Sequence, residues 1–203
     1  MSLHQFKNDY PYIKKASEIE PTTQAPLTRC TPLNRFLEDC IHHGQVSEWG
    51  MPWGHTTRYL LLLFLAEATQ RGQWCLWLHR REHLNIFAPS WLSFGVDLTK
   101  FRSAHFDGTL DGFRPVFMEP FFKIIIIDSK IPKKELPFLA KRARLQKQLI
   151  FVIHDNHISG RYANPWAKTR FNSWYDSIEQ RFYLRPIKGL SSRQLSLRAE
   201  DIW

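Results

Sequence analysis

Apolar residues gather along this chain in short, continuous runs. The clearest run covers 121–127, Phe-Phe-Lys-Ile-Ile-Ile-Ile, and is closed by Asp128. β-Branched residues without polar alternation indicate a strand that is buried on both faces, as in the centre of a parallel sheet. Residues 149–153 predict a second strand of this kind, and the aromatic-rich run 73–78 predicts a third.

Segments of helix length lie between these runs. Their apolar spacing predicts helices over 31–41, 56–71, 89–94 and 132–148. Alternation of strands and helices is typical of an α/β fold. We therefore expect three layers, in which a mostly parallel central sheet has helices on both faces.

The last part of the chain has a different pattern. Residues 181–186 and 194–198 alternate polar and apolar side chains, which predicts an antiparallel pair at one edge of the sheet. Residues 101–106, after a turn at 95–98, predict a further edge strand.

These patterns divide the chain into three parts. Residues 1–30 contain three prolines among polar residues and show no sustained periodicity, so they predict an extended N-terminal arm. Residues 31–189 form the predicted core domain, and residues 190–203 form a C-terminal tail.

Length and charge limit the kinds of protein that this chain can be. Its 203 residues, 43% of them hydrophobic, are enough to bury a substantial core. The net charge of +9 and the eight tryptophans are typical of a chain that binds an anionic partner or another protein. The alternative is that the charge serves only to keep the protein soluble.

Further sequence features bear on location and metal binding. The polar start and three scattered cysteines favour the cytoplasm, and the leucine-rich run 60–66 is far shorter than the about 20 apolar residues that span a membrane. Cys40, His42 and His43 lack a second ligand pair at zinc spacing, so we expect no metal site.

Residues 49–57, Trp-Gly-Met-Pro-Trp-Gly-His-Thr-Thr, precede a leucine-rich helix and are similar to a phosphate-binding loop. Gly54 stands at the second glycine position, and Thr56, followed by Thr57, stands at the hydroxyl position that holds Mg²⁺. An ordinary turn before a helix is the alternative interpretation. Asp128 ends a buried strand about seventy residues later, where such proteins place the acid that supports Mg²⁺.

The loop also departs from that pattern. His55 replaces the lysine, and it is too short to span two phosphates. Trp49 replaces the first glycine, with Gly50 one residue late.

Together, these motifs resemble the RecA family over residues 44–185. The loop, the segment after 73–78 with Glu82 and His83, the turn at 95–98, the strand ending in Asp128 and the strand ending in His154 follow the family's order. The resemblance implies a RecA-like core and an ATP–Mg²⁺ site. That site would be formed by Gly50, Gly54, His55, Thr56, Thr57 and Asp128, with Glu82 as the catalytic acid.

The departures imply that this nucleotide site is vestigial. His154 stands where the family has a γ-phosphate-sensing Gln, and Glu82 fits the catalytic position only if one residue is inserted. We therefore expect no enzymatic activity and no firm cofactor. The alternative is a DNA-stimulated ATPase with a degenerate loop, in which Thr56, Asp128 and Glu82 suffice.

A shortened, nucleotide-defective RecA core is similar to two bacterial groups of the SOS response. The ImuA group implies contacts with an ImuB-like polymerase-associated protein or with RecA, and possible contacts with single-stranded DNA, in error-prone translesion synthesis. The SulA group implies inhibition of cell division through FtsZ. The basic charge and the long C-terminal tail favour the ImuA group.

Basic and aromatic positions predict where such a partner binds, although a solvated helix face or an ordered loop explains them equally well. The predicted contacts lie in the helix 132–148, in the segment 156–170 and at the C-terminus. They are Lys133, Lys134, Lys141, Arg142, Arg144, Arg161, Lys168, Arg170 and Trp203.

Overall fold

The computed structural model describes residues 28–37, 40–53, 56–80, 88–160, 164–188 and 193–202. Most of the predicted N-terminal arm lies outside these ranges. Five of the predicted site residues also lie outside them, namely Gly54, His55, Glu82, Arg161 and Trp203.

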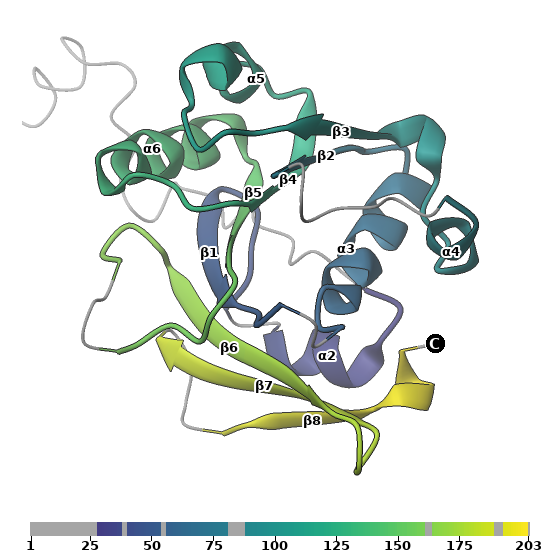
Figure 1. Cartoon of the computed structure of the whole chain (residues 1–203). Helices are drawn as coiled ribbons and strands as arrows, with labels where there is room; N and C mark the ends of the chain where they lie inside the picture. The colour runs from purple at the N-terminus through teal and green to yellow at the C-terminus, as the bar shows by residue number, and fades with distance from the viewer. Residues whose placement is uncertain are drawn as a thin grey trace, which may run out of the picture.

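Within these ranges, eight strands form one sheet in the order β3-β2-β4-β5-β1-β6-β7-β8 (Figure 1). The first six strands in this order are parallel, and β7 and β8 continue the sheet as antiparallel neighbours. The strands are β1 (Gln45–Gly50), β2 (Trp74–His79), β3 (Phe101–His105), β4 (Phe122–Asp128), β5 (Leu149–His154), β6 (Thr169–Asp176), β7 (Arg181–Lys188) and β8 (Leu195–Arg198).

The sheet confirms the predicted α/β class, its mostly parallel centre and its antiparallel C-terminal edge. The sequence pattern did not predict β1 and β6 as strands. Both contain buried polar or charged residues, such as Glu48 in β1 and Arg170 in β6, which interrupt the apolar pattern of a buried strand.

Helices cover both faces of the sheet (Figure 1). Helices α2, α3 and α4 pack on one face, and α5 and α6 pack on the other. They are α2 (Thr31–Leu37), α3 (Tyr59–Gln70), α4 (Ala88–Ser93), α5 (Arg114–Met118) and α6 (Leu136–Gln146). Four of the five correspond to predicted helices, and α5 was not predicted.

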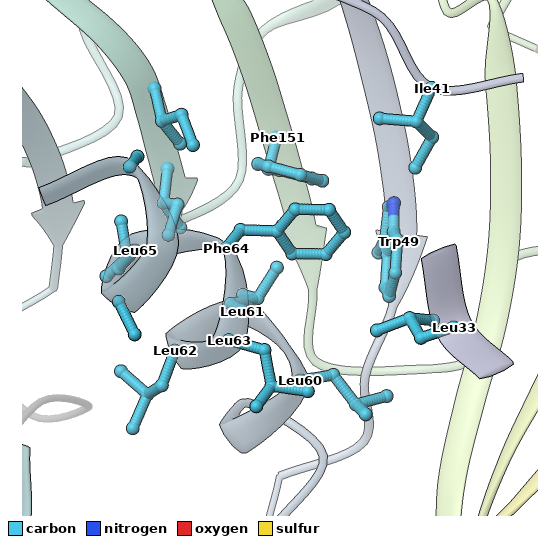
Figure 2. Packing of buried hydrophobic residues seen from close by; sticks show 14 of the residues in the cluster. Leu33, Ile41, Trp49, Leu60, Leu61, Leu62, Leu63, Phe64, Leu65 and Phe151 are labelled. Carbon is cyan, nitrogen blue, oxygen red and sulfur yellow. The ribbon is translucent and has the colours of Figure 1, made fainter. Parts of the chain in front are cut away.

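The larger apolar core is built around Trp49 of β1 (Figure 2). Its ring is fully buried and contacts the rings of Phe64, Phe151 and Phe171 at centroid distances of 6.3, 5.7 and 5.1 Å. The indole N–H donates to Ser47 Oγ at 2.7 Å. The residue that stands in place of the loop's first glycine is therefore a core residue.

The chain beyond residue 189 continues this core. Strand β8 pairs with β7, and both Leu197 and Ile202 are buried in the cluster that contains Trp49. The described part of the C-terminal segment, 193–202, thus belongs to the domain. Among the helices that the structure describes, none has the length and apolar character to cross a membrane.

Gly50 ends β1 at a point of close approach between two segments. A Cβ atom there would collide with Asn172 Oδ1 and would lie 2.8 Å from both Asn156 O and Ile158 N. Asn172 holds this segment by accepting a hydrogen bond from Ile158 N at 2.7 Å and donating one to Ile158 O at 3.0 Å. Gly50 therefore has a packing role at the position that the sequence assigned to nucleotide binding.

We predict that Gly50→Ala lowers the free energy of unfolding by about 1–3 kcal/mol, because the added methyl group overpacks this contact. Urea denaturation would measure the change. Gly112→Ala is the matched control, since a Cβ at Gly112 meets nothing within 4 Å. Equal effects of the two substitutions would contradict the packing role of Gly50.

Candidate functional site

The candidate site lies where the carboxyl ends of β1, β4 and β5 meet. Gly50 pairs in register with His154, and β4 ends beside β5 at Asp128. In open α/β sheets, ligands bind at this edge, where neighbouring connections run to opposite sides. The tertiary structure therefore brings Gly50, Asp128 and His154, which the sequence placed in one predicted nucleotide site, to the same edge of the sheet.

The acid at the centre of this edge, Asp128, is paired with an arginine side chain. Arg58 Nε donates to Asp128 Oδ2 and Arg58 Nη2 donates to Asp128 Oδ1, both at 2.8 Å. The same Nη2 lies 2.8 Å from Asp155 Oδ1, and Nη1 lies 3.3 Å from Met51 O. The guanidinium also stacks over the Trp53 ring at 4.6 Å.

Because these side chains are buried, the attraction between their charges is strong. The side chain of Asp128 is 1% exposed and that of Arg58 is 16% exposed. Burial alone would lower the pKa of Arg58, but the hydrogen bonds and charge of Asp128 outweigh it, so the pKa is raised and the guanidinium stays charged. Among the described residues, the cluster joins one arginine to two aspartates.

The ion pair changes what the site can hold. Both carboxylate oxygens of Asp128 accept hydrogen bonds from Arg58. A Mg²⁺ ion supported by Asp128 would therefore have to displace a bidentate guanidinium, which is among the stronger partners of a carboxylate.

The start of α3 carries Arg58 into this position. Thr56 has a φ of 51°, which turns the chain sharply before the helix. Tyr59 N and Leu60 N then donate to Thr56 O and Thr57 O, each at 3.0 Å. These two amide groups in the first turn of α3 are therefore bonded within the chain.

The two loop threonines have different surroundings. Thr56 is exposed, whereas Thr57 is buried and its hydroxyl has no hydrogen-bond partner among the described residues. Neither threonine bonds to Asp128 in the hydrogen bonds that the described part of the chain forms with that carboxylate.

A second polar cluster surrounds Glu48 of β1. Glu48 Oε1 is 2.8 Å from His154 Nε2, and Glu48 Oε2 accepts from Arg170 Nε at 2.5 Å. Arg170 also donates to Ser159 O at 3.2 Å. Burial raises the pKa of Glu48, but hydrogen bonds from His154 and Arg170 more than compensate, so its pKa lies below the ordinary value. His154 therefore contacts a carboxylate at the position predicted for a phosphate sensor.

The predicted contact residues divide into buried and exposed groups. Arg170 is buried against Glu48, so in this conformation it is not available to a partner. Lys168 is exposed. On α6 and the turn before it, Arg142 is half-buried with its guanidinium 5.5 Å from the Phe138 ring, and the other predicted contacts are exposed. Those exposed residues are Lys133, Lys134, Lys141 and Arg144.

A further surface was not predicted. On β6 and β7, Trp174 stacks on Tyr183 at 5.2 Å, and His157 packs edge-on against Trp174 at 5.7 Å. A hollow of about 250 Å³ is lined by His157, Trp174, Asn172 and the exposed Arg185. The core under α5 and α6 includes no described residue of β6, β7 or β8, so these helices leave this face uncovered.

Sequence patterns contained signals for some of these missed residues. Arg58 is a lone cation before a continuous apolar run, and such a residue needs a partner when the run is buried. The three aromatic residues within 170–175, Phe171, Trp174 and Tyr175, are a strand signal that also marks Trp174. No local signal identified Asp128 as the partner of Arg58, because 70 positions separate them.

In the part of the chain that the structure describes, no group of three or more His, Cys, Asp or Glu side chains is arranged to hold a metal ion. Comparison with known proteins adds no further assignment. No protein-family model matches the chain, and no curated protein has a significantly similar sequence.

We predict that Glu48→Gln lowers the free energy of unfolding by about 3–5 kcal/mol, because it leaves the buried Arg170 charge without its partner. The folded-state pKa of Glu48 lies below its ordinary value of 4.5. Its stabilisation is therefore complete above about pH 4.5 and is lost as the pH falls through the folded-state pKa.

Urea denaturation at neutral pH and at about pH 3 would measure both effects. The variant should lose less stability on acidification than the wild type. Glu200→Gln, on an exposed pair with Arg198, is the control. A pH dependence that is the same in wild type and Glu48→Gln would contradict the role of this carboxylate.

Proposed function

We propose that this chain is a RecA-like protein that does not turn over nucleotide and that acts through contacts with other macromolecules in error-prone translesion DNA synthesis. The main observation that supports a protein without nucleotide turnover is the bidentate ion pair between Arg58 and Asp128. A cation from the chain itself neutralises the acid that would otherwise support Mg²⁺.

The arrangement of the strands supports the RecA-like assignment. The loop after β1, the acid at the end of β4 and His154 at the end of β5 lie along one edge of a parallel sheet. They follow one another in the chain in the order of the RecA motifs, and α3 starts directly after the loop.

Three further positions of the proposed nucleotide site have contacts within the protein. Gly50 packs on the segment 156–158, His154 bonds to Glu48, and Trp49 is buried in the core. A nucleotide site needs these positions open or facing the ligand. Their use in packing supports a binding protein over the alternative of a working ATPase.

The cellular role in this proposal is taken from the resemblance to the ImuA group. We propose an ImuB-like polymerase-associated protein, RecA or both as protein partners. The support is the sequence resemblance, the net charge of +9 and the exposed basic residues of α6. A SulA-like inhibitor of FtsZ is the alternative, and it predicts that stoichiometric protein blocks FtsZ polymerisation.

The face of β6 and β7 that α5 and α6 leave uncovered favours an additional contact with single-stranded DNA. Stacked aromatic rings beside arginines are the features that bind bases and phosphates without strong sequence preference. Here Trp174 and Tyr183 provide the rings, and Arg185 provides an exposed cation at the end of the stack.

We predict that the purified wild type neither binds Mg-ATP nor releases phosphate, with or without single-stranded DNA. Arg58→Ala should raise the affinity for Mg²⁺ by roughly tenfold or more, because it frees both oxygens of Asp128 from a charged hydrogen-bond partner. Calorimetric titration and a phosphate-release assay would measure these quantities.

Arg71→Ala is the matched control, because Arg71 forms an exposed ion pair with Glu67 on the same helix. It should bind Mg²⁺ no better than the wild type. DNA-stimulated phosphate release by the wild type would refute the proposal of a non-catalytic site.

For the DNA contact, we predict that Trp174→Ala weakens binding of a labelled oligothymidylate by about tenfold, because stacking of one base contributes about 1–3 kcal/mol. Arg185→Ala should reduce the salt dependence of binding by about one phosphate contact. Fluorescence anisotropy at several salt concentrations would measure both. Phe121→Ala, an exposed aromatic residue beside β4, is the control and should bind like the wild type.

A further inference from the structure

Three exposed apolar side chains lie at the amino-terminal edge of the sheet, opposite the candidate site, and are called the apolar patch below. Met118 at the end of α5 is 43% exposed, Phe121 before β4 is 53% exposed and Leu145 near the end of α6 is 58% exposed. Helices α5 and α6 lead into the parallel neighbours β4 and β5, so their C-terminal ends lie at the same edge (Figure 1).

The segment 118–121 is held against α6 by two glutamine side chains, at the end of that helix and just after it. Gln146 Nε2 donates to Met118 O at 2.5 Å, and Gln148 Nε2 donates to Glu119 O at 3.0 Å. The backbone under the patch is thus fixed in position, so little ordering is needed when a partner binds there.

The side of α6 that carries Leu145 faces α5. On this side, the Phe138 ring packs edge-on against Phe117 of α5 at 6.2 Å, and the Arg142 guanidinium lies 5.5 Å from the Phe138 ring. Leu145 comes one turn after Arg142 and two turns after Phe138, so it continues the same stripe. It therefore lies at the end of α6 that is bonded to Met118.

Basic side chains border the apolar patch on two sides. On α6, the exposed Lys141 and Arg144 lie within one turn of the patch. On the other side, Phe121 stacks on the Trp74 ring at 5.0 Å. The exposed Arg102 guanidinium lies 4.6 Å from the same Trp74 ring.

These cations have no carboxylate partner within the protein. None of Lys141, Arg144 and Arg102 forms an ion pair in the part of the chain that the structure describes. Arg102 donates to backbone carbonyl oxygens just before it in the chain. The segment 118–121 contributes one exposed acid, Glu119, so positive charge is in excess around the described patch.

The apolar and basic features together indicate the chemistry of an occupant. Exposed apolar side chains in a group mark sites of contact, and cations beside them attract carboxylates. Met118 and Leu145 offer no ring on which a base could stack, which disfavours single-stranded nucleic acid. A lipid surface is disfavoured because α6 buries its apolar face in the core, through Leu136, Leu139 and Ala143.

We propose that the apolar patch binds an acidic segment of a protein partner. An apolar side chain of that segment packs on the patch, and its carboxylates pair with the bordering cations Lys141, Arg144 and Arg102. The inference rests on the proposed function, in which the partner is a protein. The patch itself is tested with a peptide probe, without that partner.

The first experiment follows the protein by NMR during titration with the peptide acetyl-Glu-Phe-Leu-Glu-Glu-amide. The methyl signal of Met118 and the indole N–H signal of Trp74 should shift along one saturation curve. We expect a Kd on the order of 1 mM, because a flexible pentapeptide must be ordered on binding. The fully buried Met51 is the internal reference, whose methyl signal should not move.

A charge-reversed peptide, acetyl-Lys-Phe-Leu-Lys-Lys-amide, tests the role of the cations. It should bind roughly tenfold more weakly, because its ammonium groups would face the basic border of the patch. Equal binding of the two peptides, or no shift of the Met118 signal with the acidic peptide, overturns the inference.

Two variants at exposed positions define the site without altering the core. Phe121→Ala should weaken binding of the acidic peptide by about fivefold or more, and Leu145→Asp should abolish it by adding a like charge. Ile178→Asp is the matched control, because Ile178 is 93% exposed between β6 and β7. It should titrate like the wild type, and equal effects of Leu145→Asp and Ile178→Asp would show that the inference is wrong.

The second experiment tests the other occupants with oligothymidylate and with vesicles of phosphatidylserine and phosphatidylcholine. Loss of binding to either of them in Phe121→Ala would assign the patch to nucleic acid or to a membrane and would overturn the inference. Unchanged behaviour of Phe121→Ala in both assays supports it. DNA-stimulated phosphate release by the wild type refutes the proposed function and leaves the peptide result standing, so the two failures are distinguishable.

Discussion

The ion pair between Arg58 and Asp128 is the interaction on which the candidate site depends. It joins the start of α3 to the end of β4 and neutralises a carboxylate that is otherwise buried without compensation. A protein that binds Mg²⁺ can leave such an acid for the metal. Here the compensating cation, Arg58, is part of the chain.

The other polar groups at this edge have also become parts of the protein's own structure. Glu48 bonds to both His154 and Arg170, and Gly50 allows the segment 156–158 to approach β1. Away from this edge, the described part of the chain presents the ring stack on β6 and β7 and the exposed basic residues Lys141 and Arg144 of α6.

Strands with continuous apolar residues could be predicted from sequence, whereas strands with buried charges could not. β4 and β5 were predicted because their side chains need no partner beyond the apolar core. β1 and β6 were missed because Glu48 and Arg170 look solvent-exposed when each is considered alone. The same limit applies to the site: the acid Asp128 was predicted, but its partner Arg58 was not.

Local periodicity and single residues are enough to predict the α/β class, the parallel centre, the antiparallel edge and the departures of residues 49–57 from the pattern of a phosphate-binding loop. Which charges meet depends instead on the tertiary structure. Arg58 and Asp128 are 70 positions apart, and Glu48 and Arg170 are 122 apart. The strand order that places β5 between β4 and β1, and β6 beside β1, creates these contacts, and no local pattern encodes that order.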